Sequence, residues 1–390
     1  MNQFFRKLRL KWFVTRNTLK YTSDYLDQLY KIYLNHNKVI HFRNGYPVYS
    51  LSTPALYSKP GANFFARQFY KSITNKSSPN LMSFAVTDNC NADCQHCSFF
   101  AGIDKIKKEI LTLSQSRKLI RDAQELGVSV INFTGGEPLM REDLPEIISS
   151  VNKDLSTTIL FTNGWFLGER VNELKKAGLD SIFVSIDSAS PEKHNVFRGL
   201  ENLFDKAIEG LEKAIKNGFS TGISCCLTPE TFKEGEFEKI VELGKKIGVH
   251  EILFYDAMPT GRYHDRKDLI VNSETKQASW TDEMIQSAKA YNENISYPGI
   301  LVYPYTTSYR SIGCACGVSY FYVTPYGDIC PCDFNHVIFG NILETPLYQI
   351  WDKIASMNDF KSVSWGECKL KDPKWQDKKT VSNEFCVFTE

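Results

Sequence analysis

Three cysteines within eight residues form the first part of the sequence that could carry chemistry. Cys90, Cys94 and Cys97 stand in the stretch VTDNCNADCQHCSFF, residues 86–100. Spacings of four and three residues would also place the thiols on one face of a helix. The Asp and Asn residues around them compete with helical hydrogen bonding and favour turns, so we expect a loop.

Two kinds of metal site are compatible with this loop. A structural zinc site needs four ligands, and His96 is poorly placed to bind the same ion as its neighbour Cys97. An iron–sulfur cubane suits the spacing better, because thiolates on a wrapped loop can each take a different iron. Three thiolates would leave the fourth iron open to a substrate or cosubstrate.

A second group of cysteines lies in the stretch CACGVSYFYVTPYGDICPC, residues 314–332. The sequence predicts a hairpin with a turn at Tyr326-Gly327-Asp328, which would bring two of these thiols together. The expected ligands of one four-thiolate cluster are Cys316, Cys332, Cys368 and Cys386, with Cys314 and Cys330 as alternative ligands. A zinc ribbon remains an alternative, because four thiolates also satisfy zinc.

Charge and hydropathy limit the compartment and the class of partner. The net charge is +1, which gives no electrostatic case for binding nucleic acid. No apolar run reaches the ~18 residues that a membrane span needs, and charges interrupt any signal-peptide core. We therefore expect a cytoplasmic protein, where thiols stay reduced and the 11 cysteines favour metal ligation over disulfides.

Apolar segments typical of strands alternate with amphipathic helical segments from residue 82 onward. The predicted strands are 82–87, 128–133, 157–162, 181–186, 220–227 and 250–255, and the predicted helices are 114–126, 143–151, 167–177, 200–217 and 235–247. This alternation indicates parallel strands joined by helical crossovers. Six such units fit an open doubly wound sheet or an incomplete barrel, and spacing alone does not choose between them.

The flanking segments have a different character. Residues 39–50 predict a hairpin around Asn44-Gly45, and 52–64 and 72–80 read as loop and linker. We expect four parts: an N-terminal extension over 1–80, an α/β domain with parallel strands over 81–256, a connector with one helix at about 280–292 over 257–311, and a small cysteine-rich domain over 312–390.

The first twenty residues carry six basic side chains and no acidic one. Phe4, Phe5, Leu8 and Trp12 recur at helical spacing, with most of the basic residues elsewhere. This pattern fits an amphipathic helix on an anionic lipid surface, and hence peripheral membrane contact. It equally fits a helix that packs its aromatic stripe on the α/β domain.

The loop at 90–97 resembles the signature of the radical S-adenosylmethionine (SAM) superfamily, C-x3-C-x-aromatic-C, with His96 in the aromatic position. The resemblance implies a [4Fe-4S] cluster on the three cysteines, whose open iron binds SAM. One electron would cleave the sulfonium, giving a 5′-deoxyadenosyl radical that removes a hydrogen atom from a substrate. It also implies the fold, an α/β incomplete (βα)6 TIM-like barrel.

Motifs at successive strand ends extend this resemblance. TGGEPL resembles the family's GGEP motif, which binds the methionyl amino group, and FTNG resembles a T-N-G turn near the ribose. VSIDS ends the fourth strand, and HNVFRG resembles an H-x3-R-G segment whose arginine would pair with the methionyl carboxylate. The implied cofactor-binding residues are His96, Thr134, Gly135, Gly136, Glu137, Asn163, Ser185, Asp187 and Arg198.

The second cysteine region resembles the auxiliary-cluster region of SPASM and twitch domains. Cys316, Gly327 and Cys332 fit C-x9-15-G-x4-C, and the later FGNI and LYQIW fit as well. Full SPASM domains have more cysteines downstream, whereas only Cys368 and Cys386 follow here. The resemblance therefore implies one auxiliary [4Fe-4S] cluster.

Two adjacent cysteines, Cys225 and Cys226, lie on the predicted fifth strand. Because strand side chains alternate, one of the two can face the interior. One interpretation is that both are small buried apolar residues. The other is that one thiol donates a hydrogen atom to a substrate radical, as in related peptide epimerases.

The function that follows is radical chemistry on a substrate that the sequence does not identify. We expect peptide or protein modification, with a lipid or small molecule at the membrane surface as the alternative. The expected partners are SAM, a reductant such as a flavodoxin or ferredoxin, and the substrate. A non-catalytic iron–sulfur electron carrier or sensor is the competing class, but it does not predict GGEP and H-x3-R-G at strand ends.

Overall fold

The structure of the chain is a computed structural model, which describes residues 34–74, 77–99, 108–269, 280–308, 310–311, 313–360 and 368–371. The basic N-terminal segment and Cys386 lie outside the described residues. No helix in the described part of the chain is long and apolar enough to cross a bilayer.

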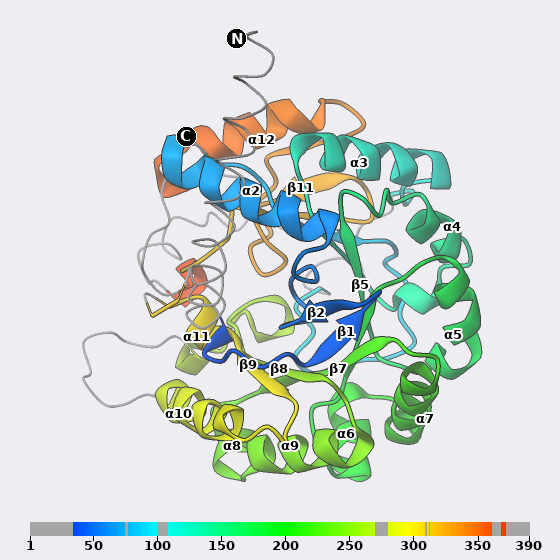
Figure 1. The fold of residues 1–390 in the computed structure, drawn as a ribbon, viewed down its shortest axis with the longest axis vertical. Coiled ribbons are helices and arrows are strands. Elements are labelled where there is room, and N and C mark those ends of the chain that lie inside the picture. Colours follow the sequence, from blue (N-terminus) through cyan, green and yellow to red (C-terminus); the bar gives the residue numbers. More distant parts are fainter. Residues whose placement is uncertain are drawn as a thin grey trace, which may run out of the picture.

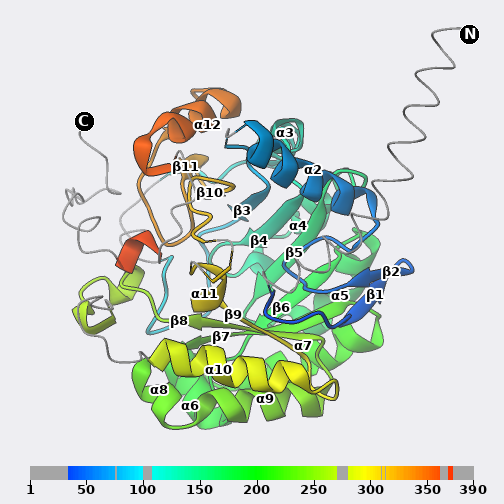
Figure 2. The same ribbon diagram turned by 60° about the vertical axis from the view of Figure 1, so that its left-hand side comes forward.

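Six parallel strands in sequence order form the centre of one large sheet, as the alternating pattern predicted (Figures 1 and 2). They are β3 (Leu81–Ala85), β4 (Val130–Thr134), β5 (Thr157–Thr162), β6 (Ser181–Ser185), β7 (Ser220–Leu227) and β8 (Glu251–Asp256). Two further parallel strands extend the sheet: β9 (Gly299–Val302) beside β8, and β10 (Tyr320–Val323) beside β3. The described strands form a curved sheet that is open between its two edge strands, β9 and β12 (Gly340–Asn341).

Helices cover the outer face of this sheet, and a second apolar cluster lies on its inner side. The crossover helices are α3 (Leu113–Leu126), α4 (Leu144–Ser149), α5 (Leu167–Lys176), α7 (Leu203–Lys216) and α9 (Glu236–Ile247), and α10 (Trp280–Glu293) is the helix predicted in the connector. Helix α3 shows how residues in the sequence mark the two ends of a helix. Thr112 and Gln115 form a capping box at its start, and Gly127 ends it with φ 114°.

The N-terminal segment covers the end of the barrel where the strands begin. The hairpin of β1 (His41–Arg43) and β2 (Tyr46–Val48) has the predicted turn, because Asn44 and Gly45 adopt φ of 51° and 81°. Just beyond the hairpin, the Leu51 amide donates to Oε2 of Glu251 at 2.8 Å, at the first residue of β8. The hairpin therefore lies at the end of the strands opposite to the motifs.

One element of this segment contradicts the sequence interpretation. Residues 52–64 and 72–80 were expected to be loop and linker, but 59–64 and 72–74 belong to helix α2, which spans Lys59–Thr74 (Figure 2). Pro60 stands in the first turn, where its missing N–H costs nothing, and Phe65 is buried in the inner apolar cluster. Tertiary packing of this apolar side chain outweighs the turn-forming residues around it.

The C-terminal cysteine segment joins the same sheet. Strands β10 and β11 (Asp328–Cys330) form the predicted hairpin, with Gly327 at φ 90° in its turn. β10 pairs in parallel with β3, so the hairpin lies next to the strand from which the three-cysteine loop departs. Helix α12 (Leu347–Ser356) packs against α3 and holds this segment on the barrel (Figure 1).

Candidate functional site

A cavity of about 370 Å³ runs inside the curved sheet and reaches the carboxyl ends of the central strands. This size is within the usual range for ligand sites, about 300–1,000 Å³. Cys90, Cys94 and Cys97 all line it, and so does Cys316 from the second cysteine group. Every residue that the family resemblance implied for SAM binding lines the same cavity: His96, Thr134, Gly135, Gly136, Glu137, Asn163, Ser185, Asp187 and Arg198.

Three glycines from three different loops hold the cysteine loop by direct backbone contact. A Cβ atom on Gly136 would lie 2.2 Å from the Asn89 carbonyl oxygen. A Cβ on Gly199 would lie 2.8 Å from the Asp93 carbonyl oxygen, and one on Gly261 would lie 2.2 Å from that of Cys97. Because such distances are impossible for real side chains, the loop fits only against glycine at these positions.

Backbone hydrogen bonds run along the same contacts. The Glu137 amide donates to Asn89 at 2.7 Å, and the Asp93 amide donates to Arg198 at 3.0 Å. The Arg262 amide donates to Cys97 at 3.0 Å. The loop is thus positioned by the segments that follow β4, β6 and β8, and its conformation depends on the whole sheet.

Sequence interpretation missed the contribution of Gly261 and Arg262, which follow β8 in a segment that the motifs did not cover. Besides its backbone contact, the Arg262 guanidinium bonds the Asp93 side chain and the Cys94 carbonyl oxygen. The sequence feature that could have indicated this contact is the position of Gly261. It follows soon after the carboxyl end of a strand, as the glycines after β4 do.

Glu137 ties two strand ends together from a buried position, with 1% of its surface exposed. Its carboxylate accepts from the Thr162 hydroxyl at 2.6 Å and from the amides of Asn163 at 2.7 Å and Leu139 at 3.0 Å. Burial raises the pKa of Glu137, which these hydrogen bonds oppose. The side chain of Asn163 in turn donates to Asn91 at 2.8 Å, so the T-N-G turn also supports the cysteine loop.

Asp187 is the charged centre of the site, and its carboxylate is buried. It accepts from Arg198 Nε at 2.7 Å and from the Cys226 amide at 2.8 Å, and His96 Nε2 lies 3.7 Å away. Burial alone would raise the pKa of Asp187, but Arg198 and His96 hold it below its ordinary value. Arg198 also points Nη1 at Cys94 Sγ, 3.8 Å away, so this ion pair reaches the cysteine loop.

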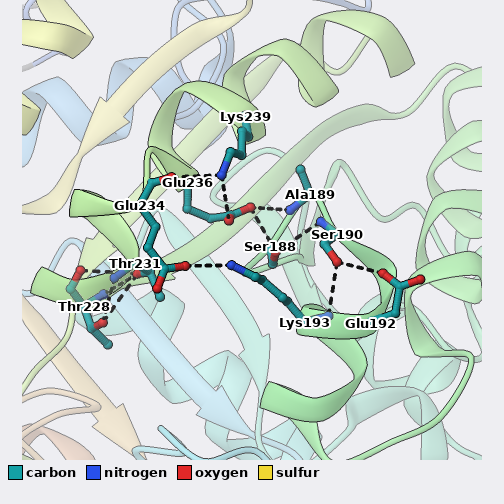
Figure 3. Close-up of polar contacts among 10 residues, drawn as sticks. All are labelled: Ser188, Ala189, Ser190, Glu192, Lys193, Thr228, Thr231, Glu234, Glu236 and Lys239. Carbon is teal, nitrogen blue, oxygen red and sulfur yellow. Dashed lines mark hydrogen bonds and ion pairs between the residues drawn. The ribbon is translucent and has the colours of Figure 1, made fainter.

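A second buried carboxylate positions the loop that carries Asp187 (Figure 3). Glu236, at the start of α9, accepts from the Ser188 hydroxyl at 2.9 Å and from the Ala189 amide at 2.6 Å. Ser190 then caps α6 (Pro191–Arg198) by accepting from the Lys193 amide. The loop after β6 and the helix that ends in Arg198 are therefore fixed against α9.

The adjacent thiols on β7 face opposite ways. Cys226 lines the cavity, whereas Cys225 is fully buried in the core between the sheet and the helices. Burial raises the pKa of Cys226, so its thiol keeps its proton at neutral pH. Alternation along a strand requires the two side chains to face opposite sides of the sheet. The structure shows that Cys226 faces the cavity and Cys225 faces the helices.

The second cysteine group brings four buried thiols together. Cys314 hydrogen-bonds to Cys316 and to Cys368, and Cys316 hydrogen-bonds to Cys332. Cys330 is not in this group: it packs with Tyr322 and Phe99 in a separate apolar cluster that Cys97 also contacts. Cys314, which the sequence interpretation gave as an alternative ligand, is the fourth thiol of this group among the described residues, and Cys386 lies outside them.

Thiols are the usual ligands of iron–sulfur clusters, and both cysteine groups fit that chemistry. In the described part of the chain, no three His, Cys, Asp or Glu side chains are arranged to hold a single metal ion. A cluster does not require such convergence, because each thiolate binds its own iron. Proximity, burial and donor type therefore support cluster sites at both cysteine groups.

Comparisons with known proteins agree with this arrangement. Residues 84–244 match the profile of the radical SAM superfamily, and residues 314–377 match that of SPASM, an iron–sulfur cluster-binding domain. An AdoMet-dependent heme synthase from Methanosarcina barkeri is 28% identical over 318 residues, which cover 77% of this chain and 87% of that protein. A GTP 3′,8-cyclase from Tolumonas auensis is 30% identical over 243 residues, 59% of this chain and 72% of that protein.

Solved structures show the same fold. SuiB from Streptococcus suis, solved bound to the precursor peptide SuiA, aligns with a TM-score of 0.58 at 16% identity. The alignment covers 82% of this chain and 78% of SuiB.

Proposed function

The chain belongs to the radical SAM superfamily and carries a SPASM domain, and from this membership we propose that it abstracts a hydrogen atom from a substrate held between two clusters. Reductive cleavage of SAM to methionine and a 5′-deoxyadenosyl radical is the chemistry that the first cluster supplies when bound. The observation that carries the proposal is that one cavity is lined by the three cysteines of the first group, by Cys316 of the second and by the ends of the central strands.

Each cysteine group has an assigned role. Cys90, Cys94 and Cys97 would hold the cluster that binds SAM, and their loop is already shaped by the glycine contacts described above. The auxiliary cluster would be held by the second group, Cys314, Cys316, Cys332 and Cys368. Cys316 lines the cavity, so a substrate beside the auxiliary cluster would also lie inside the reaction chamber.

Charged side chains orient SAM in this proposal. Glu137 and Arg198 would face the amino and carboxylate groups of its methionyl part, while Asn163 and Ser185 line the region assigned to the ribose. Arg198 is held by Asp187, and Glu137 by the Asn163 amide after β5, so both side chains are positioned before the ligand arrives. Preorganised groups of this kind place the sulfonium without further reordering.

Cys226 is the assigned hydrogen-atom donor when the product requires one. A substrate radical would take the hydrogen atom of the S–H bond, forming a C–H bond and leaving a sulfur radical. A one-electron reductant such as a flavodoxin, together with a proton, would restore the thiol. Deuterium from heavy water should enter the product through this thiol, and Cys226→Ala should abolish its incorporation, whereas Cys225→Ala should not.

The proposed substrate is a peptide. SuiB was solved with a precursor peptide, and we extend that substrate class to this chain, which shares its fold. A small molecule is the second candidate, because the relatives compared here include a heme synthase and a GTP cyclase.

The decisive experiment is anaerobic reconstitution followed by dithionite and SAM, with 5′-deoxyadenosine measured by chromatography. We expect about eight irons per chain for two cubane clusters, and 5′-deoxyadenosine that disappears in Cys94→Ala. Cys330→Ala is the matched control, because it removes a buried thiol outside both groups. Iron bound without any 5′-deoxyadenosine would contradict the proposal and favour an electron carrier.

A further inference from the structure

Part of the cavity is built from aromatic rings that the SAM-binding motifs do not include. The rings of Tyr255 and Tyr303 have centroids 5.1 Å apart, and Phe334 lies 5.9 Å from the first and 5.8 Å from the second. All three residues line the cavity. Their mutual contacts hold the rings in place, because each ring packs against the other two.

A carboxylate adjoins this aromatic group. Asp333 precedes Phe334 in the chain, lines the same cavity and is hydrogen-bonded by the Tyr320 hydroxyl. Tyr320 is fixed in turn, because its hydroxyl also hydrogen-bonds to Ser83 on the neighbouring strand β3 at 2.7 Å. Asp333 is therefore a positioned acceptor at the wall of the cavity.

The cavity contains few positive charges to offset this carboxylate. Four carboxylates line it, from Glu137, Asp187, Asp256 and Asp333. Among the described residues of its lining, Arg198 is the one lysine or arginine, and its guanidinium is already paired with Asp187 at 2.7 Å. An anionic substrate group at Asp333 would therefore meet like charge, whereas a cation would supply the missing partner.

We propose that Asp333 and the aromatic group of Tyr255, Tyr303 and Phe334 bind a protonated amine or guanidinium of the substrate. The aromatic faces attract a cation through their quadrupoles, and the carboxylate accepts its N–H donors. That the bound cation belongs to a substrate rests on the proposed function. Within the peptide class, it selects a segment with a lysine or arginine side chain at the modified position or next to it.

The location adds a consequence for the reaction. Cys316 lines the same cavity, and Asp333 directly follows Cys332, so the bound cation would lie beside the auxiliary cluster site. Because Cys90, Cys94 and Cys97 line the same cavity, carbon atoms next to the anchored cation can extend toward the three-cysteine loop. The recognition group and the reacting carbon are then different parts of one residue or of neighbouring residues.

Binding of two matched tripeptides tests the proposal. The probes are acetyl-Gly-Lys-Gly-amide and acetyl-Gly-norleucine-Gly-amide, titrated by calorimetry at neutral pH into the full chain, anaerobically reconstituted and saturated with SAM. We expect the lysine probe to bind at least about ten-fold more tightly, a difference of about 1.4 kcal/mol. Asp333→Asn should remove this preference, and Phe334→Leu should reduce it several-fold while keeping an apolar side chain.

The control variant is Asp352→Asn, which removes an exposed carboxylate of α12 in the same segment and should leave the preference unchanged. Equal binding of the two probes, no binding of either at millimolar concentration, or a preference that survives Asp333→Asn would each overturn the proposal. The same preparations are assayed for 5′-deoxyadenosine. Loss of 5′-deoxyadenosine with an intact lysine preference would sink the proposed function alone, and the reverse result would sink only the cation site.

Discussion

Replacing Gly136 by alanine should remove the first cluster and leave the second in place. Gly136 does not adopt positive φ, so alanine is compatible with its backbone, and the variant isolates the contact with the cysteine loop. The new Cβ would lie 2.2 Å from the carbonyl oxygen of Asn89 and 2.8 Å from that of Asp88. Both atoms are backbone, so no side chain can rotate away to make room.

The size of the effect follows from this geometry. The contact with Asn89 would have to lengthen from 2.2 Å to at least 3.0 Å, which moves the residue immediately before Cys90. Forcing a methyl group into a packed site costs about 1–3 kcal/mol, or roughly five-fold to over a hundred-fold in an equilibrium constant. Much of this strain falls on the loop that presents the three thiols, so we expect cluster occupancy to fall accordingly.

Iron analysis and 5′-deoxyadenosine formation measure the outcome. The variant should lose up to about four of about eight irons per chain and should form less 5′-deoxyadenosine in proportion. Gly168→Ala is the matched control: it places a methyl group in helix α5, 3.3 Å from the flexible end of Lys213, where alanine should be neutral or slightly stabilising. Full iron and unchanged 5′-deoxyadenosine in Gly136→Ala would refute the claim that this contact shapes the loop.

Three further substitutions test other parts of the structure. Burial raises the pKa of Glu251 to about 8, so the native chain holds a proton that the unfolded chain releases above pH 4.5. The free energy of unfolding should therefore fall as pH rises from about 4.5 to about 8, by at most about 5 kcal/mol. Chemical denaturation across this pH range measures the fall, and Glu251→Gln should abolish it. Cys314→Ala should lower the iron content by up to about four per chain, whereas Cys330→Ala should not; equal iron in the two variants would contradict the assignment of the four thiols. Asp187→Asn leaves the guanidinium of Arg198 buried without its charge partner, so thermal unfolding should show a loss of about 3–5 kcal/mol and SAM should bind more weakly. An unchanged melting temperature would show that another group compensates Arg198.

The local pattern of the sequence determined most of the barrel. Apolar strands, capped amphipathic helices and the Asn44-Gly45 turn depend on neighbouring residues, so their positions could be predicted within a few residues. The motifs at the strand ends were also readable, because parallel strands bring their carboxyl ends to one edge of a sheet. Helix α2 could not be read this way, since its stability comes from burying Phe65 against distant strands.

What only the tertiary structure decided depends on contacts between distant residues. Alternation along β7 required Cys225 and Cys226 to face opposite sides, but the pairing of β7 with its neighbours determines which thiol lines the cavity. The parallel pairing of β10 with β3 brings Cys316 to the cavity that Cys90, Cys94 and Cys97 line, although more than two hundred residues separate Cys316 from them. The grouping of Cys314 with Cys368, and the separation of Cys330, likewise follow from how the hairpin lies on the barrel. Spacing along the chain identifies the kind of chemistry, whereas the meeting of distant segments decides which side chains perform it.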